Sequence, residues 1–195
     1  MNAAPSRKEL THDRIVDVAA RVIRRAGYHK VGVADVMKEA GLTHGGFYAH
    51  FASRDALLVE AMARAGRDSG AVIAARLAQR RAQGVGPFAA LIESYLSDEH
   101  MAGAEHGCMV AALASEMPRL DEEVADAARV GVLRLIDLVR HVLPSDVDGG
   151  QAPVIASSMV GALQLARVLG GKAGRALLAA SRQQLLSQYD PRSAR

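Results

Sequence analysis

The chain of 195 residues is poor in aromatic residues and nearly free of cysteine. It has no Trp, and Phe and Tyr together make up only 4% of the residues. The single cysteine excludes a disulfide within the chain and fits a reducing compartment. We find no uninterrupted run of about 18 apolar residues, so no membrane span is expected. The first residues also lack the apolar core of a secretion signal, and together these absences predict a cytoplasmic protein.

The residues that are abundant favour helices. Half of the chain is apolar, and Ala, Leu, Val, Arg and Glu are the dominant types. These residues are better helix formers than strand formers. The spacing of the apolar positions predicts an all-α protein of about nine helices.

Charge is distributed unevenly, although the net charge is only +3. Residues 1–54 carry nine Lys or Arg against five Asp or Glu, a net charge of +4. Residues 55–166 carry nine against fifteen, a net charge of −6, and residues 167–195 carry six against one, a net charge of +5. The first segment therefore suits a polyanion such as DNA, whereas phosphate would repel the middle one. A charge of this size also occurs on ordinary surfaces, so it indicates DNA only where a binding motif coincides with it.

Residues 43–51, which read Thr-His-Gly-Gly-Phe-Tyr-Ala-His-Phe, provide such a motif. They follow a helical pattern over residues 33–40 and a break at Gly41-Leu42. A helix, a short turn containing glycine and a second short helix make up a helix-turn-helix, which places its second helix in the major groove. The spacing therefore predicts a DNA-reading segment here.

The outer face of this segment is costly for stability. Phe47 and Phe51 are four residues apart, so they share one face and are expected to point inward. The outward positions are then occupied by His44, Gly45, Tyr48 and His50. Each glycine costs a helix about 1 kcal/mol relative to Ala. Glycine is useful, however, where the backbone must come close to another backbone, such as a phosphate chain.

Residues 11–62 resemble the DNA-binding domain of the TetR family of transcriptional regulators. The matching residues are Arg14-Ile15, Ala19-Ala20, Gly27-Tyr28, Asp35-Val36, Ala40-Gly41-Leu42-Thr43, Gly45, Phe47-Tyr48, His50-Phe51, Ser53-Arg54 and Ala56-Leu57-Leu58. In the family a capping Thr or Ser precedes the second helix and touches a phosphate. Val31 and Gly32 stand there in this chain, so that contact has no counterpart.

The resemblance implies which residues would touch DNA. They are Thr43, His44, Gly45, Gly46, Tyr48, His50 and Arg54. Phosphate contacts would come from Tyr48, His50 and Arg54, and also from Thr43, whose hydroxyl is expected to cap the recognition helix as well. His44 stands where the family typically has Lys, which makes a contact there dependent on pH. The two glycines would let the backbone approach the groove.

We expect two domains, residues 1–52 for DNA binding and residues 53–195 for ligand binding and dimerisation. Residues 1–10 are expected to be a loose arm that precedes a first helix over residues 11–26. Gly27 is expected to end that helix. A long helix over residues 53–82 would connect the domains.

The second domain would hold a ligand among its helices. The candidate ligand-binding residues are Met62, Phe88, Tyr95, Cys108, Met109, Leu113, Met117 and Met159. Met side chains adapt to irregular cavities, but each of these positions also fits an ordinary core. Cys108 follows Gly107 at the expected start of a helix, where free N–H groups favour a thiolate. A Gly-Cys at this place resembles family branches that sense electrophiles or oxidants; the alternative is a small buried residue.

Residues 152–169 form the most apolar predicted helix, in which Arg167 is the only charge. A helix that is apolar nearly all round is buried on more than one side. The resemblance implies that this helix and the last one, over residues 172–189, form a four-helix contact between two copies. The candidate dimer residues are Val154, Ser158, Gly161, Ala162, Leu165, Leu178 and Leu185. The alternative is a central buried helix of a monomer.

Together these features predict a TetR-like regulator, by family default a repressor, that a small hydrophobic or reactive ligand releases from a palindromic operator. Its expected partners are double-stranded DNA, a second copy of the chain and an unidentified effector, with no cofactor, metal or membrane. One alternative is a helical interaction module that does not bind DNA, and another is a small α-helical enzyme. The sequence shows no Gly-rich phosphate loop, metal-ligand cluster or nucleophile elbow, so no enzyme is expected.

Overall fold

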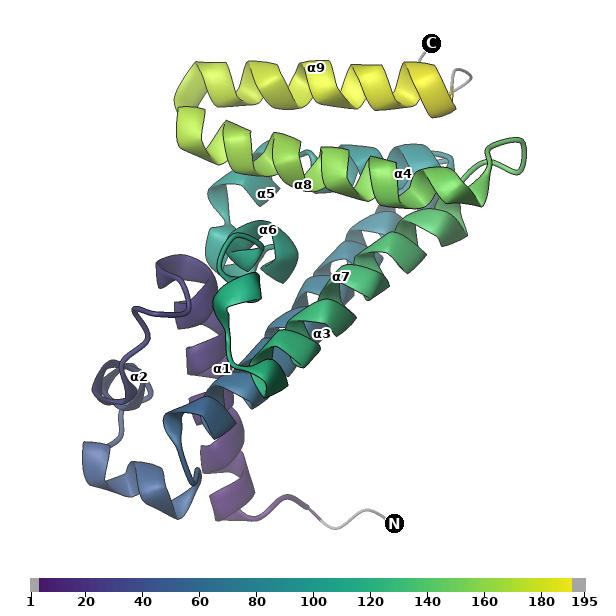
Figure 1. Cartoon of the computed structure of the whole chain (residues 1–195). Coiled ribbons are helices and arrows are strands. Elements are labelled where there is room, and N and C mark those ends of the chain that lie inside the picture. The colour runs from purple at the N-terminus through teal and green to yellow at the C-terminus, as the bar shows by residue number, and fades with distance from the viewer. Residues whose placement is uncertain (1–3, 191–195) are drawn as a thin grey trace.

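A head of three helical segments opens the chain and leads into a long helix (Figure 1). The computed structural model describes residues 4–190, so Arg192 and Arg195 of the basic tail lie outside the described residues. The head consists of α1 (Arg7–Ala26), α2 (Val33–Glu39) and the 3-10 segment η1 (His44–Ala49), and α3 (Arg54–Ala82) follows it.

The remaining elements are helical as well. They are α4 (Pro87–Tyr95), α5 (Asp98–Ala102), η2 (Ala104–His106), α6 (Met109–Leu113), η3 (Met117–Arg119), α7 (Glu122–Val142), η4 (Gly149–Gln151), α8 (Ala152–Leu169) and α9 (Gly171–Tyr189). Nine α-helices and no strand occur within the described residues, which confirms the predicted all-α fold. In Figure 1, α3 and α7 run alongside each other away from the head, and α8 and α9 form a layer at the far end.

Helix α1 begins earlier than the apolar pattern alone indicates. The Glu9 N–H donates to the Ser6 hydroxyl at 3.3 Å, and the Ser6 N–H donates to the Glu9 carboxylate at 2.6 Å. This reciprocal capping box starts the helix at Arg7, so the prediction of a loose arm was wrong for residues 7–10. At the other end Gly27, with φ of 88°, caps the helix as predicted.

Two apolar cores divide the molecule, and α3 contributes to both. The head core joins α1, α2, Phe47 of η1 and the following Phe51 to the first turns of α3, which contribute Leu57, Leu58 and Met62. Further along, Ile73 and Leu77 of the same helix pack into the second core with α4, α7, α8 and α9. The first core also takes side chains from α6, η3 and α7. The predicted division between residues 52 and 53 stays a prediction, and the packing crosses it.

Helix α8 covers the second core with one side and is bare on the other. Ile155, Met159 and Leu163 are fully buried, whereas Leu165 and Val168 are exposed. The segment Gly149–Leu169 has the length and the mean hydropathy, 1.4, of a membrane span, although it contains no uninterrupted apolar run. A core helix of a soluble protein has the same properties, and the buried side of α8 is packed in that way.

His100 lies in the second core as a neutral imidazole. Its Nδ1 is 2.7 Å from the Tyr95 carbonyl, and its Nε2 accepts the Cys108 N–H at 2.9 Å. Burial is the main cause that lowers the pKa of His100 to about 4, and the charges of Arg167 and Arg76 lower it further. These bonds fix the turn between α5 and α6 to the end of α4.

Gly174 should be intolerant of even one added methyl group. A Cβ there would collide with the carbonyl of Ala166 where α9 crosses α8, and would press on the Met101 sulfur at 3.1 Å. We expect Gly174→Ala to lower the free energy of unfolding by about 1–3 kcal/mol, despite the better helix propensity of Ala. Urea unfolding measures the loss. The control is Gly66→Ala, where the Cβ meets nothing within 4 Å and stability should stay equal or rise. Equal stability of both variants would contradict the described packing of α8 on α9.

Unfolding should become easier in mild acid because of His100. The unfolded imidazole binds a proton below its ordinary pKa of about 6.5, whereas the folded one resists protonation down to about 4. The unfolded state therefore binds more protons in this window, and stability falls as the pH drops through it. We expect this group to contribute a loss of about 3 kcal/mol between pH 7 and pH 4. Urea unfolding of the wild type and of His100→Gln at several pH values isolates the loss of stability caused by His100, because the Gln side chain does not titrate. Parallel pH profiles would show that His100 is not buried as described.

Candidate nucleic-acid interface

The turn between α2 and η1 is tight and depends on one glycine. Gly41 has φ of 70°, a conformation that other residues rarely adopt. The N–H groups of Gly41 and Leu42 donate back to the carbonyls of Lys38 and Met37, at 3.0 and 2.8 Å. These bonds end α2 and direct the chain sharply into η1, which is the predicted helix-turn-helix geometry.

The recognition segment is a 3-10 helix and not the α-helix that the spacing suggests. The Gly46 N–H donates to the Thr43 carbonyl at 3.1 Å, and the His50 N–H donates to the Phe47 carbonyl at 2.9 Å. Thr43 occupies the N-cap position, but its hydroxyl makes no capping bond, so that part of the prediction was wrong. Without a side-chain cap, and with two glycines in its first turn, the segment winds more tightly than an α-helix.

Two aromatic rings attach η1 to the head. Phe47 and Phe51 are 1% and 3% exposed, and their rings stack with centroids 5.5 Å apart. The predicted inward face is therefore confirmed. The His12 imidazole of α1 also stacks on Phe51, with ring centroids 4.4 Å apart, and its Nε2 is 2.8 Å from the Glu60 carboxylate of α3. Reasoning from the sequence missed His12, because its partners lie far from it along the chain.

The outer face of η1 is as open as expected. Thr43, His44 and Gly45 are exposed, and the Tyr48 side chain is 71% exposed. A Cβ on Gly45 would meet nothing within 4 Å, and one on Gly46 would make only ordinary contacts of 3.7 Å. Nothing in the chain itself therefore requires glycine at either place. The glycines are explained if another molecule comes close to this backbone.

His50 is half-buried and does not project freely outward. Its Nδ1 is buried and has no hydrogen-bond partner among residues 4–190. Burial lowers the pKa of His50, and the nearby His12 and Lys8 lower it further, so the ring is neutral at neutral pH. The predicted phosphate contact of His50 would therefore be a neutral hydrogen bond.

Arg54 is already engaged inside the head. Its Nε donates to the Val31 carbonyl at 3.0 Å, its Nη2 donates to the Tyr28 carbonyl at 2.8 Å, and the guanidinium lies over the Tyr28 ring. The remaining Nη1 is 3.5 Å from the Asp55 carboxylate. These bonds fasten the start of α3 to the loop after α1. The phosphate contact predicted for Arg54 stays a prediction, and Nη1 and the second N–H of Nη2 are left to make it.

Comparison with known proteins identifies relatives of this head and of the chain. Residues 15–61 match the sequence model described as bacterial regulatory proteins, tetR family. An uncharacterized HTH-type transcriptional regulator of Mycobacterium tuberculosis is 29% identical over 167 residues, which are 80% of this chain and 84% of that protein. The head, residues 15–61, therefore matches the DNA-binding domain of the TetR family.

Solved structures of other proteins share the whole fold. A TetR-family regulator from Agrobacterium tumefaciens superposes with a TM-score of 0.72 at 24% identity, covering 93% of this chain and 98% of that one. The reduced form of Escherichia coli NemR superposes with a TM-score of 0.73 at 19% identity, covering 91% and 96%. The chain thus shares the fold of these proteins, and its helix-turn-helix head matches the tetR family model.

The candidate ligand residues do not meet in one place. Four of them lie in the head core, namely Met62, Met109, Leu113 and Met117. The other four lie in the second core, namely Phe88, Tyr95, Cys108 and Met159. The single pocket that we predicted from all eight is therefore not formed, because most of these side chains fill the two cores. Only Cys108 and Met109 line a cavity together.

The candidate dimer residues divide into exposed and buried groups. Val154 and Leu165 are 53% and 58% exposed, Ser158 is exposed and Gly161 is half-buried. Ala162, Leu178 and Leu185 are buried within the subunit, so their assignment to a surface between copies was wrong. They face the second core from α8 and α9. The most exposed apolar residue of α8 is Val168, at 84%, which the candidate set did not include.

Tyr48 allows a direct test of how this TetR-family head docks. Its hydroxyl is free and exposed, so Tyr48→Ala should weaken binding to every duplex by a similar factor of about ten, as loss of a phosphate contact would. Tyr48→Phe removes only the hydroxyl and should cost most of the same factor. Fluorescence anisotropy titrations with specific and unrelated duplexes measure both. Unchanged affinity of the Ala variant would show that η1 does not dock through this face.

Proposed function

We propose that the chain represses transcription by binding a palindromic DNA operator as a homodimer, and that a small hydrophobic molecule releases it. DNA would be read by two heads placed one helical turn apart, roughly 34–36 Å. Phosphate and groove contacts would come from Thr43, Tyr48 and His50, with His44, Gly45, Gly46 and the free edge of Arg54 beside them.

The observation that carries the DNA-binding part is the outer face of η1. It exposes a large aromatic residue, Tyr48, beside two glycines that no internal contact explains. Lys30 and Lys38 of the same head are exposed, and no ion pair holds them within residues 4–190. An open backbone with cations around it suits a phosphate chain. Few long polar side chains stand on η1, so operator shape would supply part of the specificity.

The exposed side of α8 supports the homodimer. Val154, Ser158, Gly161, Leu165 and Val168 follow one another at spacings of three and four residues, so they form one stripe along the helix. Among these positions no side chain is charged, and Gly161 leaves room for close approach. An apolar stripe on one helix that has a small residue at its centre suits a copy of itself related by a twofold axis.

The hydrophobic effector is favoured over a reactive one. Cys108 is only 5% exposed, and its amide is bonded to His100. Reactive cysteines are partly exposed as a rule, whereas buried ones are inert. We place the protein in the cytoplasm, where an operator and a free thiol both occur.

Breaking the α8 stripe tests the dimer and the DNA-binding function together. Leu165→Asp with Val168→Asp would place two carboxylates in the contact and should yield a monomer by sedimentation. Its affinity for a duplex taken from the promoter upstream of its own coding region should fall by about 10²–10⁴, because the second head no longer binds as part of the same molecule.

The matched control is Val130→Asp with Leu133→Asp, which changes the same two residue types at the same spacing on α7. It should stay dimeric and keep its affinity. A dimeric wild type that ignores duplex DNA at low salt would favour the interaction module. A stripe variant that remains dimeric would refute the α8 contact.

A further inference from the structure

Two cavities meet at one short stretch of wall beneath α3. One, of about 210 Å³, lies between α3 and the turn that leads from α5 to α6. The other, of about 100 Å³, lies between α3, α6 and α7. Ser69, Ile73 and Cys108 line both. A modest movement of these three side chains would therefore join the two spaces.

Glycines keep the second cavity open. Gly66 and Gly70 stand one turn apart on α3 and line it, although glycine weakens the interior of a helix. A Cβ on either would meet nothing within 4 Å, so packing does not demand glycine there. On the opposite wall a Cβ on Gly131 would collide with the end of the Met109 side chain. The missing side chains of Gly66 and Gly70 thus leave space, whereas at Gly131 the Met109 side chain already occupies the place of a Cβ.

The walls suit an uncharged, largely apolar molecule. Inside are Ile73, the Cys108 thiol and the neutral His100 ring, whose two nitrogens are both already bonded. The charged side chains of the linings, such as Arg76 and Arg134, are not buried. The Tyr95 side chain, which is fully buried beside Cys108, lines neither cavity. The cavities therefore favour a ligand without a charge.

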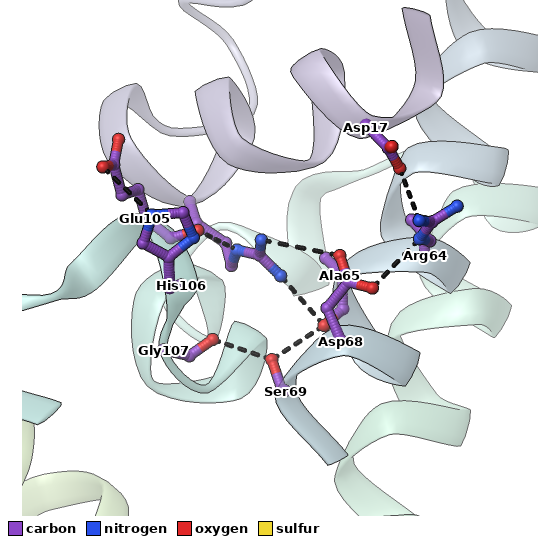
Figure 2. A network of polar contacts seen from close by, with 9 residues as sticks. Asp17, Arg64, Ala65, Asp68, Ser69, Glu105, His106 and Gly107 are labelled. Atoms are coloured by element: carbon purple, nitrogen blue, oxygen red, sulfur yellow. Dashed lines mark hydrogen bonds and ion pairs between the residues drawn. The ribbon is translucent and has the colours of Figure 1, made fainter. Parts of the chain in front are cut away.

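The shared wall is tied to the head by polar contacts (Figure 2). The Ser69 hydroxyl lies 2.7 Å from the carbonyl of Gly107 and 2.7 Å from that of Ala65. Arg24 of α1, which is 4% exposed, donates to the Ala65 carbonyl at 3.0 Å and to the Glu105 carbonyl at 2.6 Å. Ser69 and Arg24 therefore share an acceptor on α3, and both hold the segment of residues 105–107.

Carboxylates complete this connection. Asp68 lies 3.9 Å from Arg24 and 3.0 Å from Arg64, and Arg64 reaches Asp17 of α1 at 2.8 Å. Figure 2 shows the resulting line of contacts from the turn at Gly107 across α3 to α1. A change in the spacing between α3 and residues 105–107 therefore acts directly on the helix that carries the head.

We propose that the paired cavities at Ser69, Ile73 and Cys108 are the effector site, that they take a neutral, mostly apolar molecule, and that the bond between Ser69 and Gly107 transmits its binding to α1. The proposal rests on the proposed function for its last clause only. Ligand binding separates α3 from residues 105–107 and breaks the bond between Ser69 and Gly107. Arg24 then keeps either its bond to Ala65 of α3 or its bond to Glu105, and α1 moves with the element to which Arg24 stays bonded. The two heads of a dimer then lose the separation that fits the operator.

The cavity is tested with acetophenone, which is neutral and mostly apolar, against benzoate, which has similar size but carries a charge. NMR of protein labelled with ¹³C in the methyl groups of Ile and Met follows Ile73 and Met109. Acetophenone should shift both signals in a saturable way, and benzoate should not. Gly70→Leu fills the cavity from an open position and should abolish the shifts. The control, Ala71→Leu, lies on the exposed side of α3 and should leave them unchanged.

Absence of shifts in the wild type, equal shifts with benzoate, or shifts that persist in Gly70→Leu would each overturn the site. Circular dichroism and thermal unfolding of Gly70→Leu show that the variant is folded, as the free space around Gly70 leads us to expect.

Transmission is tested with Ser69→Ala. This variant should still bind acetophenone in the NMR experiment, but acetophenone should no longer weaken its binding to the promoter duplex, whereas wild type and Ala71→Leu should release the duplex. Release that is equal in Ser69→Ala and wild type would overturn the role of the Ser69 bond. A wild type that binds acetophenone but no duplex would overturn the proposed function and leave the cavity result standing, so the two failures are distinguishable.

Discussion

Helix α3 enters both apolar cores, and neither core can be repacked without moving it. Its first turns bury Leu57, Leu58 and Met62 against the head, and its later turns bury Ile73 and Leu77 under α4 and α7. An unbroken helix is stiff along its axis, because every interior residue is hydrogen-bonded to the turn before it. A displacement at one end is therefore carried to the other. The position of the DNA-binding surface is set by how α3 lies in the second core.

A buried cation, the guanidinium of Arg24, lies where α3 contacts α1. The guanidinium of Arg24 has lost most of its water, and burial lowers its pKa although Asp68 opposes the shift. Burying a charge is costly unless hydrogen bonds and counter-charges replace the water. Two carbonyls and a distant carboxylate do so here, and they belong to two different elements. The arrangement holds one geometry of α1, α3 and the turn before α6, because in any other the cation would be left unpaired.

Local patterns in the sequence predicted the fold well. The turn at Gly41, the inward faces of Phe47 and Phe51 and the end of α1 at Gly27 all depend on residues within one turn of each other. The capping box of Ser6 and Glu9 is also a local pattern, but the start of α1 was predicted at residue 11 because the apolar stripe begins near there. The 3-10 winding of η1 was not predictable from spacing, since the aromatic residues fit either helix.

The candidate site was predicted less completely, because its contacts are distant in sequence. The His12 ring on Phe51 and the bonds of Arg54 to the loop after α1 join residues from different elements. Composition also could not tell which apolar side of α8 or α9 faces inward. Leu178 and Leu185 therefore entered the dimer set although they belong to the core, and Val168 was left out. The predicted ligand residues failed for the same reason, since large apolar side chains were as suitable for filling a core as for lining a pocket.

The bare side of α8 has a consequence for related regulators that share a cell. Its exposed positions are Pro, Val, Ser and Leu, so no pair of like charges is available to repel a foreign subunit. In the proposed dimer, discrimination between a second copy and a paralogue must then depend on shape, above all on what fits opposite Gly161. A paralogue with a bulky residue at the position of Gly161 would be excluded by steric overlap. A paralogue with a small residue at that position would exchange subunits with this protein.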